Sequence, residues 1–352
     1  MSSLLFLVPH AISRAYLFFF VGLTLTAFQP PAYSQTQRKA EPKFTPILQT
    51  VIGQAKAEGK VVLFTASTKR TADEAARLSQ AFQAYFEVPV KVDLASLGGT
   101  VKFVSRLREE ARAGIKPPVD LLCCMNNYQV VWSRQDGIVH DVDWKALGVP
   151  ASAYLSDVNA PYIEVNTRPF IYNTKLVKEA DIPRKHEDLL HPKFKGRLVA
   201  PASPSIFPFL VPAMGEQAAL DFVKRLVEEQ KLVLVPTFAD TRQRVTNGEF
   251  LVGYGSDVAD LSKKGAPIAT APLKHGGVPA GLVVVKNAAH PAAAQLLAYF
   301  LTSTPEGEKA AEDILEYTKP RPGDTDVVVV EAQWFIQHGK RLTELFKNIL
   351  KL

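Results

Sequence analysis

The stretch that decides the fold is VNTRPFIYNTKLVKEADIPRKHEDLLHPKFKGRLVAPASPS, residues 165–205. Residues 168–173 are rich in β-branched and aromatic side chains and include a proline that disfavours a helix, so we expect an extended strand there. A polar segment with Pro183 follows, then a basic cluster and a short apolar strand at 198–199. A loop at 201–205 ends the stretch and could open a helix at Ile206. This order predicts a strand that leaves one lobe, a surface excursion, and the first strand-to-loop unit of a second lobe.

The chain before this stretch alternates strand, small polar loop and helix. The apolar run at 60–65 is typical of a strand buried on both faces, and the periodic residues Leu78, Phe82 and Tyr85 indicate a helix after it. Strands at 89–93 and 118–124 repeat the unit, and the same rhythm returns after residue 205. The pattern predicts an α/β fold of two lobes, each a mostly parallel sheet flanked by helices. We assign residues 44–164 plus 273–352 to lobe 1 and residues 165–272 to lobe 2.

Ligands of such sheets bind at the carboxyl ends of the strands, where loops leave backbone N–H groups free at helix starts. We therefore expect a cleft between the lobes. Arg242 is the best partner for an anion because a guanidinium holds carboxylate or phosphate in a bidentate fork, and Arg168 is the second. The alternatives are helix caps for the hydroxyl residues and surface ion pairs for the arginines. The candidate ligand-binding residues are Ser67, Thr68, Ser96, Gly99, Thr100, Asn126, Arg168, Ser203, Ser205, Thr241, Arg242 and Tyr254.

Composition disfavours several other classes of protein. The net charge of +6 is spread along the chain without the clustered stripe that nucleic acid requires, so we expect no nucleic-acid partner. No nucleophile–base motif, P-loop or metalloprotease motif occurs, so we expect no catalytic residue, no cofactor and no metal site. The cysteines, Cys123 and Cys124, are adjacent, which we interpret as small apolar residues at a strand end, with a redox pair as the alternative.

The N-terminal residues have the order of a secretory signal peptide. Arg14 precedes a short apolar run, and Ala32-Tyr-Ser34 forms a cleavage site of small residues. We expect residues 1–34 to be removed and the mature protein to be periplasmic. A retained membrane anchor is the alternative, but it would need a longer apolar run.

The motifs YNTKL at 172–176 and DLLHPKFKG at 188–196, followed by the apolar strand and the Ser/Pro-rich loop at 197–205, occur in a specific order. In this the chain resembles type II periplasmic solute-binding proteins of ABC importers, in the branch of the ferric-ion, thiamine and phosphonate receptors. The resemblance runs from about residue 59 to the C-terminus. It implies hinge closure on a small solute and docking of a monomer on an ABC permease in the inner membrane.

Ferric-binding members of that branch hold iron with adjacent tyrosines after the strand that corresponds to residues 250–254. This chain has Ser256 and Asp257 there, and only the single Tyr254 nearby. We therefore expect a polar or anionic organic solute, such as an organic anion or a phosphonate, and keep ferric ion as the alternative ligand. A binding module that feeds a sensor system and an enzyme on the same fold are the alternative functions.

Overall fold

The strands form two separate sheets in this computed structural model, which describes residues 44–352 except 66–69, 98–99, 256 and 318–325. The first sheet has the order β2–β1–β3–β11–β5–β4, with β12 paired to β11, and the second has the order β10–β6–β9–β7–β8. The prediction of a two-lobe α/β fold is confirmed. The strands are β1 (Lys60–Phe64), β2 (Lys91–Ala95), β3 (Leu121–Asn126), β4 (Tyr154–Leu155), β5 (Ala160–Thr167), β6 (Phe170–Asn173), β7 (Leu198–Pro201), β8 (Val233–Val235), β9 (Val252–Tyr254), β10 (Ile268–Thr270), β11 (His275–Val284) and β12 (Val327–Val329).

Each sheet has three neighbouring parallel strands at one end of its strand order. Strand β1 pairs in parallel with β2 and β3, and β7 pairs in parallel with β8 and β9. Val61, Leu63 and Phe64 of β1 are fully buried because helices cover both faces of the sheet. The remaining strands are mostly antiparallel additions made by segments that cross between the sheets.

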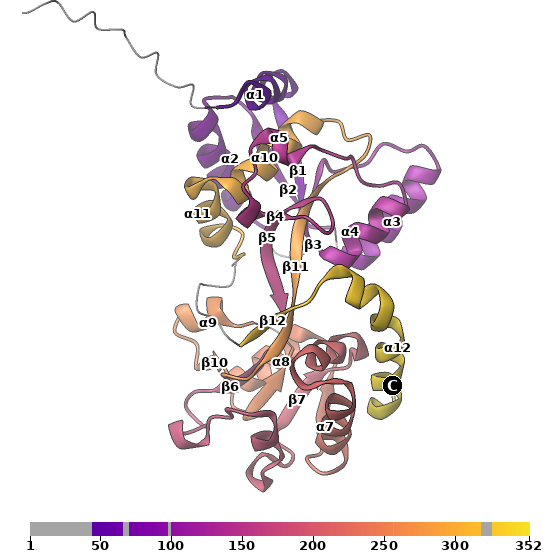
Figure 1. The fold of residues 1–352 in the computed structure, drawn as a ribbon. Helices are drawn as coiled ribbons and strands as arrows, with labels where there is room; N and C mark the ends of the chain where they lie inside the picture. The colour runs from indigo at the N-terminus through magenta and orange to yellow at the C-terminus, as the bar shows by residue number, and fades with distance from the viewer. Residues whose placement is uncertain (1–43, 66–69, 98–99, 256, 318–325) are drawn as a thin grey trace, which may run out of the picture. The chain divides into compact units, whose positions relative to one another are not determined.

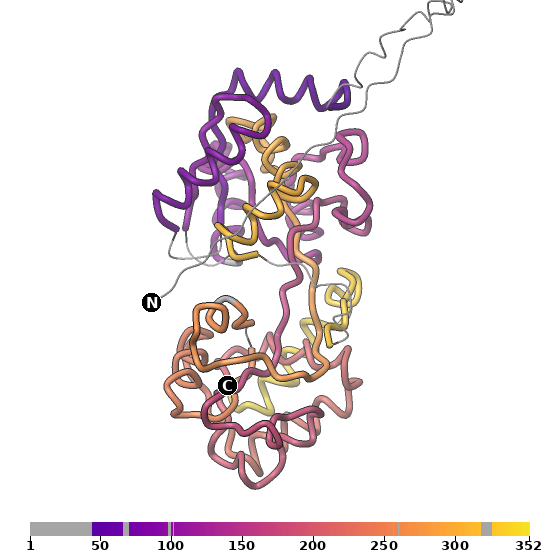
Figure 2. Tube along the Cα trace, turned by 90° about the vertical axis from the view of Figure 1, so that its left-hand side faces the viewer, coloured from indigo at the N-terminus to yellow at the C-terminus, as the bar shows by residue number. Residues whose placement is uncertain are grey.

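Two extended connections join the sheets. Strand β5 ends at Thr167 and β6 starts at Phe170 in the other sheet, while the chain returns from β10 to β11. Figures 1 and 2 show β5 and β11 side by side, and the two strands are antiparallel neighbours. The approach at this pair is close, since a Cβ on Gly277 would lie 2.4 Å from a methyl of Val165. A larger residue at position 277 would push the two connecting strands apart.

Helices cover both sheets, and their ends carry the expected caps. Thr71 and Glu74 form a capping box on the helix that follows β1, and the carboxylate of Glu58 accepts hydrogen bonds from Ala292 and Ala293 at the start of another helix. The chain enters a 3₁₀ segment, η5 (Pro204–Leu210), near the predicted helix at Ile206. The α-helices are α1 (Pro46–Glu58), α2 (Ala72–Phe86), α3 (Thr100–Arg112), α4 (Asn127–Gln135), α5 (Trp144–Leu147), α6 (Val211–Met214), α7 (Glu216–Glu228), α8 (Phe238–Thr246), α9 (Ala259–Lys263), α10 (Pro291–Ser303), α11 (Pro305–Asp313) and α12 (Ala332–Leu350). Among the described residues, none of these helices has the length and apolar character needed to cross a membrane.

The C-terminal helix α12 packs differently from our assignment of residues 273–352 to lobe 1. Its first residue, Ala332, belongs to an apolar cluster of the first sheet, but Leu342, Phe346 and Leu350 belong to the main cluster of the second sheet. Figure 1 shows α12 beside α7, with which it is in contact. The reason is the apolar stripe of α12, which needs a partner along its whole length and finds it on α7 and η5.

Candidate functional site

Asn126 is the predicted residue most clearly placed at the carboxyl end of a strand. It is the last residue of β3 and is buried. Its Nδ2 donates a hydrogen bond to the hydroxyl of Tyr128 at 3.0 Å, and its Oδ1 accepts one from Nδ2 of Asn166 on β5 at 3.2 Å. The Oδ1 of Asn166 in turn accepts a hydrogen bond from the guanidinium of Arg168. These contacts join the end of the first sheet to the connection between the sheets.

Arg168 lies in the first connection and is held on several sides. Its guanidinium carbon is 5.1 Å from the ring centre of Phe209 and 5.3 Å from that of Phe238, and an Nη donates to the carbonyl of Thr167 at 2.7 Å. Its Nε is buried and has no hydrogen-bond partner among the described residues. Burial lowers the pKa of Arg168, and the nearby Tyr128 and Glu164 oppose that shift. The group is therefore a rigid cation with donor capacity still available.

A cavity of about 410 Å³ opens at Arg168 and is lined by segments of both sheets. Arg242 reaches it from α8, so the two predicted arginines share one cavity. Its volume is within the range of small-molecule sites. The lining residues are Glu164, Val165, Asn166, Thr167, Arg168, Arg242, Asp257, Ala259, Lys263, Lys264, Glu312, Asp313 and Glu316.

Most of the charges around this cavity are paired. Lys263 lies 2.8 Å from Glu312, and Lys264 lies 2.8 Å from Glu316. The carboxylate of Asp257 accepts hydrogen bonds from backbone N–H groups at the start of α9. By contrast, the guanidinium of Arg242 makes no hydrogen bond or ion pair within the part of the chain that the structure describes. The two arginines are therefore the cations of this wall that are available to a solute.

The carboxyl group of Glu164 also lines the cavity. Burial raises its pKa, and the Arg168 charge opposes that rise. A raised pKa favours the neutral acid, which weakens the repulsion that Glu164 would exert on an anion in the cavity.

Two predicted site residues, Tyr254 and Thr241, are buried in the core and do not line this cavity, so their role in binding stays a prediction. Tyr254 is 2% exposed, its hydroxyl donates to the carbonyl of Ile206 at 3.0 Å, and its ring packs 4.6 Å from that of Phe170. Thr241 is buried on the face of α8 that meets β9, where a Cβ on Gly253 would lie 2.9 Å from its methyl group. Strand β9 is central in its sheet, so helices and loops cover both of its faces.

The other predicted residues are spread over several loops. Ser96 follows β2, and its hydroxyl is buried without a hydrogen-bond partner among the described residues. Thr100 begins α3. Ser203 and Ser205 follow β7, and their hydroxyl oxygens lie 3.2 Å apart. None of these four residues lines the cavity at Arg168, and their role in binding stays a prediction. Ser67, Thr68 and Gly99 lie outside the described residues, as does Ser256.

The charged residues of α9 and of the end of α11 line the cavity but were not among the predicted site residues. A signal existed for Asp257, which directly follows the strand–loop junction after Tyr254. No local signal marked Glu312 or Glu316, because they approach α9 only through the arrangement of the lobes.

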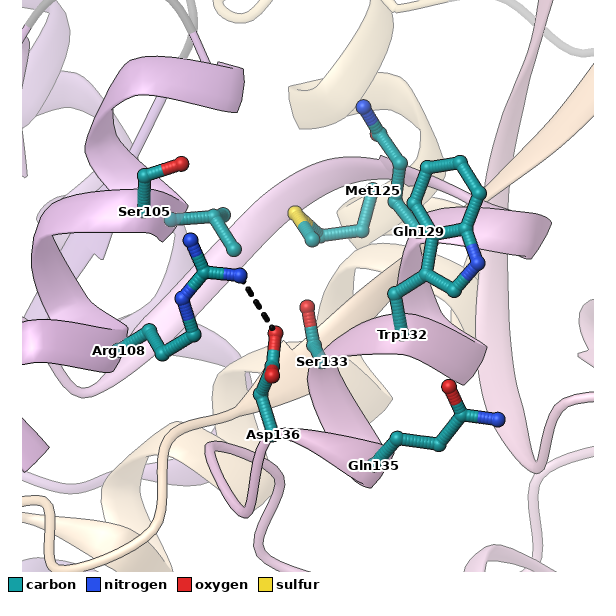
Figure 3. Close-up of a pocket in the computed structure, with 9 residues that line it drawn as sticks. Ser105, Arg108, Met125, Gln129, Trp132, Ser133, Gln135 and Asp136 are labelled. Carbon is teal, nitrogen blue, oxygen red and sulfur yellow. Dashed lines mark hydrogen bonds and ion pairs between the residues drawn. The ribbon is translucent and has the colours of Figure 1, made fainter. Parts of the chain in front are cut away.

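A second cavity, of about 320 Å³, lies between α3 and α4 (Figure 3). Trp132, Met125 and Ser133 line it, together with Arg108 and Asp136, whose charged groups are 3.5 Å apart. All its lining residues belong to the first sheet and its helices, and it contains none of the predicted site residues. A solute bound there would not connect the two sheets.

Two sheets joined by paired extended strands, with a polar cavity at the connection, define the two-lobe periplasmic binding-protein fold. Solved structures share it. Iron-bound HitA from Pseudomonas aeruginosa has a TM-score of 0.61 at 19% identity, over 82% of this chain and 99% of HitA. The substrate-binding protein of an ABC transporter from Agrobacterium tumefaciens has a TM-score of 0.65 at 17% identity, over 85% and 97% of the two chains. AfuA from Actinobacillus pleuropneumoniae, with fructose-6-phosphate bound, has a TM-score of 0.62 at 17% identity, over 84% and 99%.

The chain belongs to the family described as bacterial extracellular solute-binding protein, whose model matches residues 135–327. This family consists of transport-associated binding proteins that bind small solutes outside the cytoplasm and work with ABC permeases. A comparison with curated protein sequences gave no significant match. The neighbouring structures carry chemically different ligands, iron and a sugar phosphate, so they do not identify the solute of this chain.

Proposed function

We propose that this protein captures a small organic anion, such as a carboxylate, phosphonate or phosphate ester, in the cavity at Arg168 and delivers it to an ABC permease. The main support for the proposal is the availability of two guanidinium groups in that cavity, those of Arg168 and Arg242. The lysines beside them are paired with glutamates, whereas the guanidinium groups face the cavity without a carboxylate partner among the described residues. A planar guanidinium donates two parallel hydrogen bonds to a carboxylate or phosphate, which favours an anion over a neutral solute.

The cavity also supplies contacts from both sheets, as a closing cleft requires. Asn166 and Glu164 come from β5 in the first sheet, whereas Arg242 comes from α8 on the second. A solute that bridges these groups binds the closed arrangement better than the open one and shifts the equilibrium by that difference in affinity. The exposed Lys263–Glu312 ion pair adds little to closure, because such pairs contribute about 0–1 kcal/mol.

Ferric ion fits the described cavity less well. A hard cation wants several phenolate or carboxylate oxygens, but Tyr254 is buried with its hydroxyl bonded to Ile206. Among the described residues, no group of three or more His, Cys, Asp or Glu side chains is arranged to hold a metal ion.

Thermal-shift measurements on the mature protein test the proposal. The panel contains organic carboxylates, phosphonates, sugar phosphates, and ferric ion with citrate. A solute at one hundred times its Kd stabilises the folded state by about 2.7 kcal/mol. A hydrogen bond to a charged group contributes about 1.5–3 kcal/mol, so the loss of one such bond in Arg242→Ala should weaken binding by about 10- to 150-fold.

Arg244→Ala is the matched control, because Arg244 is on the same helix but pairs with Glu249 at the surface. It should leave the shift unchanged. Equal losses in Arg242→Ala and Arg244→Ala would contradict the proposal. So would a panel in which ferric ion is the sole stabilising ligand.

A further inference from the structure

The adjacent cysteines sit on a bulge in β3. Met125 is opposite Gly281 of β11, and Leu122 is opposite Val283, so Cys123 and Cys124 together face one residue, Leu282. Two residues opposite one define a β-bulge, a feature that re-aims side chains and often lies next to functional sites.

The bulge places both thiols on the same side of the sheet. Successive side chains of a regular strand point to opposite faces. Here Leu122 and Met125 pack in one apolar cluster, whereas Cys123 and Cys124 both pack in another. The alternation breaks because Cys124 has a φ of 62°, in the left-handed region that side chains other than glycine rarely adopt. As a result the two sulfur atoms lie 3.0 Å apart, inside the normal separation of non-bonded sulfurs.

The surroundings shield this pair from solvent. Cys123 is 0% exposed and Cys124 is 9% exposed, with Tyr317 and Glu164 beside the Cys124 thiol. Burial raises the pKa of Cys124, so the folded protein holds little thiolate there. Exchange with an outside thiol or disulfide is therefore slow while the sheet is intact, and faster when β3 is exposed during folding.

We propose that Cys123 and Cys124 are a modification site that closes to a vicinal disulfide during folding in an oxidising compartment. The oxidant is an external disulfide, of a protein or of a small thiol compound. One cysteine thiolate attacks it and forms a mixed disulfide, which releases the first thiol of the oxidant. The second cysteine thiolate then attacks the sulfur of its neighbour and releases the other thiol. Two protons and two electrons pass from the cysteines to the oxidant.

The position of the bulge explains why such a bond would be protected. Adjacent Cα atoms of a trans peptide are about 3.8 Å apart, below the range of about 4.4–6.8 Å that ordinary disulfides span, so the ring is strained and easily reduced when accessible. Burial of Cys123 and Cys124 opposes that reduction. A ring at this point would also fix the bulge two residues before Asn126, at the end of β3. The inference does not depend on the identity of the solute.

Refolding of the mature protein in a mixture of oxidised and reduced glutathione tests it. The products are unfolded in the presence of N-ethylmaleimide and weighed by mass spectrometry. We expect a chain two hydrogens lighter than the reduced protein, with no cysteine alkylated and an internal link in the peptide that contains Cys123 and Cys124. Reduction with dithiothreitol in denaturant should restore two alkylated cysteines.

Two free cysteines after this treatment, or glutathione adducts in place of the internal link, would overturn the proposal. Cys124→Ser serves as the control, because the remaining cysteine must then be alkylated or carry glutathione. A second measurement needs no variant. Dithiothreitol should reduce the wild-type pair at least tenfold faster in denaturant than in the folded protein, and equal rates would refute the shielding by burial.

Discussion

Replacing Asp120 by alanine should destabilise the first lobe more than any surface change of charge. Asp120 is 2% exposed and begins the run that leads into β3. Its carboxylate accepts three hydrogen bonds, from the backbone N–H of Val62 at 2.8 Å and from the backbone N–H and ring Nδ1–H of His290, each at 2.9 Å. It thereby ties β1 to the start of α10.

The magnitude follows from the donors that lose their acceptor. A hydrogen bond to a charged group contributes about 1.5–3 kcal/mol, and a buried donor left without its acceptor costs about 1–3 kcal/mol. The ring of His290 is 24% exposed and can turn to water, so the two backbone donors account for most of the loss. We expect Asp120→Ala to lower the free energy of unfolding by about 3–5 kcal/mol. At about 2.1 cal/mol/K of unfolding entropy per residue, this lowers Tm by about 4–7 °C for a chain of this length.

Urea unfolding followed by circular dichroism measures this change. Asp120→Asn keeps one acceptor and should lose less than Asp120→Ala. Asp141→Ala is the surface control, because the Asp141 carboxylate is 66% exposed and pairs with Arg134, and it should change stability by less than about 0.5 kcal/mol. A loss below about 1 kcal/mol in Asp120→Ala would refute the assignment of Asp120 as a buried tie between β1 and α10.

Two further predictions concern a helix contact and a titration. Gly307→Ala should lower the free energy of unfolding by about 1–3 kcal/mol or more, since its Cβ would lie 1.8 Å from the carbonyl oxygen of Phe300. Gly53→Ala, in the open middle of α1, should raise it by about 0.4–1 kcal/mol. Urea unfolding of both variants measures the difference, and equal effects would contradict the close packing at Gly307. Glu164→Gln should flatten the pH dependence of stability without ligand. The raised pKa of Glu164 contributes stability that is full below pH 4.5 and is lost as pH rises through the raised value, so the variant should gain stability relative to wild type above pH 4.5. Parallel curves of Tm against pH for the two proteins would contradict this.

The order of strands and helices could be predicted from the sequence because it depends on local patterns. The apolar run of β1 and the periodic face of α2 each determine their element without knowledge of the rest of the chain. The connection between the sheets was predicted for the same reason, because Pro169 disfavours a helix and the aromatic and β-branched residues at 170–172 favour a strand.

The directions of side chains at the site were harder to predict. Thr241 and Arg242 are neighbours on α8, but one faces β9 and the other faces the cavity. A signal did exist for Thr241, because Thr241 and Val245 are four residues apart and form the buried face of the helix. No such signal existed for Tyr254, whose burial follows from the central place of β9 in the sheet order.

Pairing between distant segments decided the remaining features. The amphipathic pattern of α12 predicts a helix but does not say which core receives Leu342 and Phe346. The bulge at Cys123 is defined only by the register of β3 against β11, which starts more than 150 residues later in the chain. Such contacts depend on the closure of long loops, and no short window of sequence contains them.

The two arginines of the cavity differ in how much freedom they bring to a solute. The guanidinium of Arg168 is already held between Phe209 and Phe238 and bonded to the carbonyl of Thr167, so its ordering cost is met when the chain folds. Arg242 has no such restraint among the described residues, and it must lose rotamer freedom, about 0.5–1.5 kcal/mol, when a solute binds. A restrained donor such as Arg168 defines the position of the anion. A donor that can change rotamer, such as Arg242, tolerates different shapes in the rest of the solute. In the binding mode proposed above, the arrangement therefore favours selection by charge at Arg168 over selection by the size of the rest of the solute.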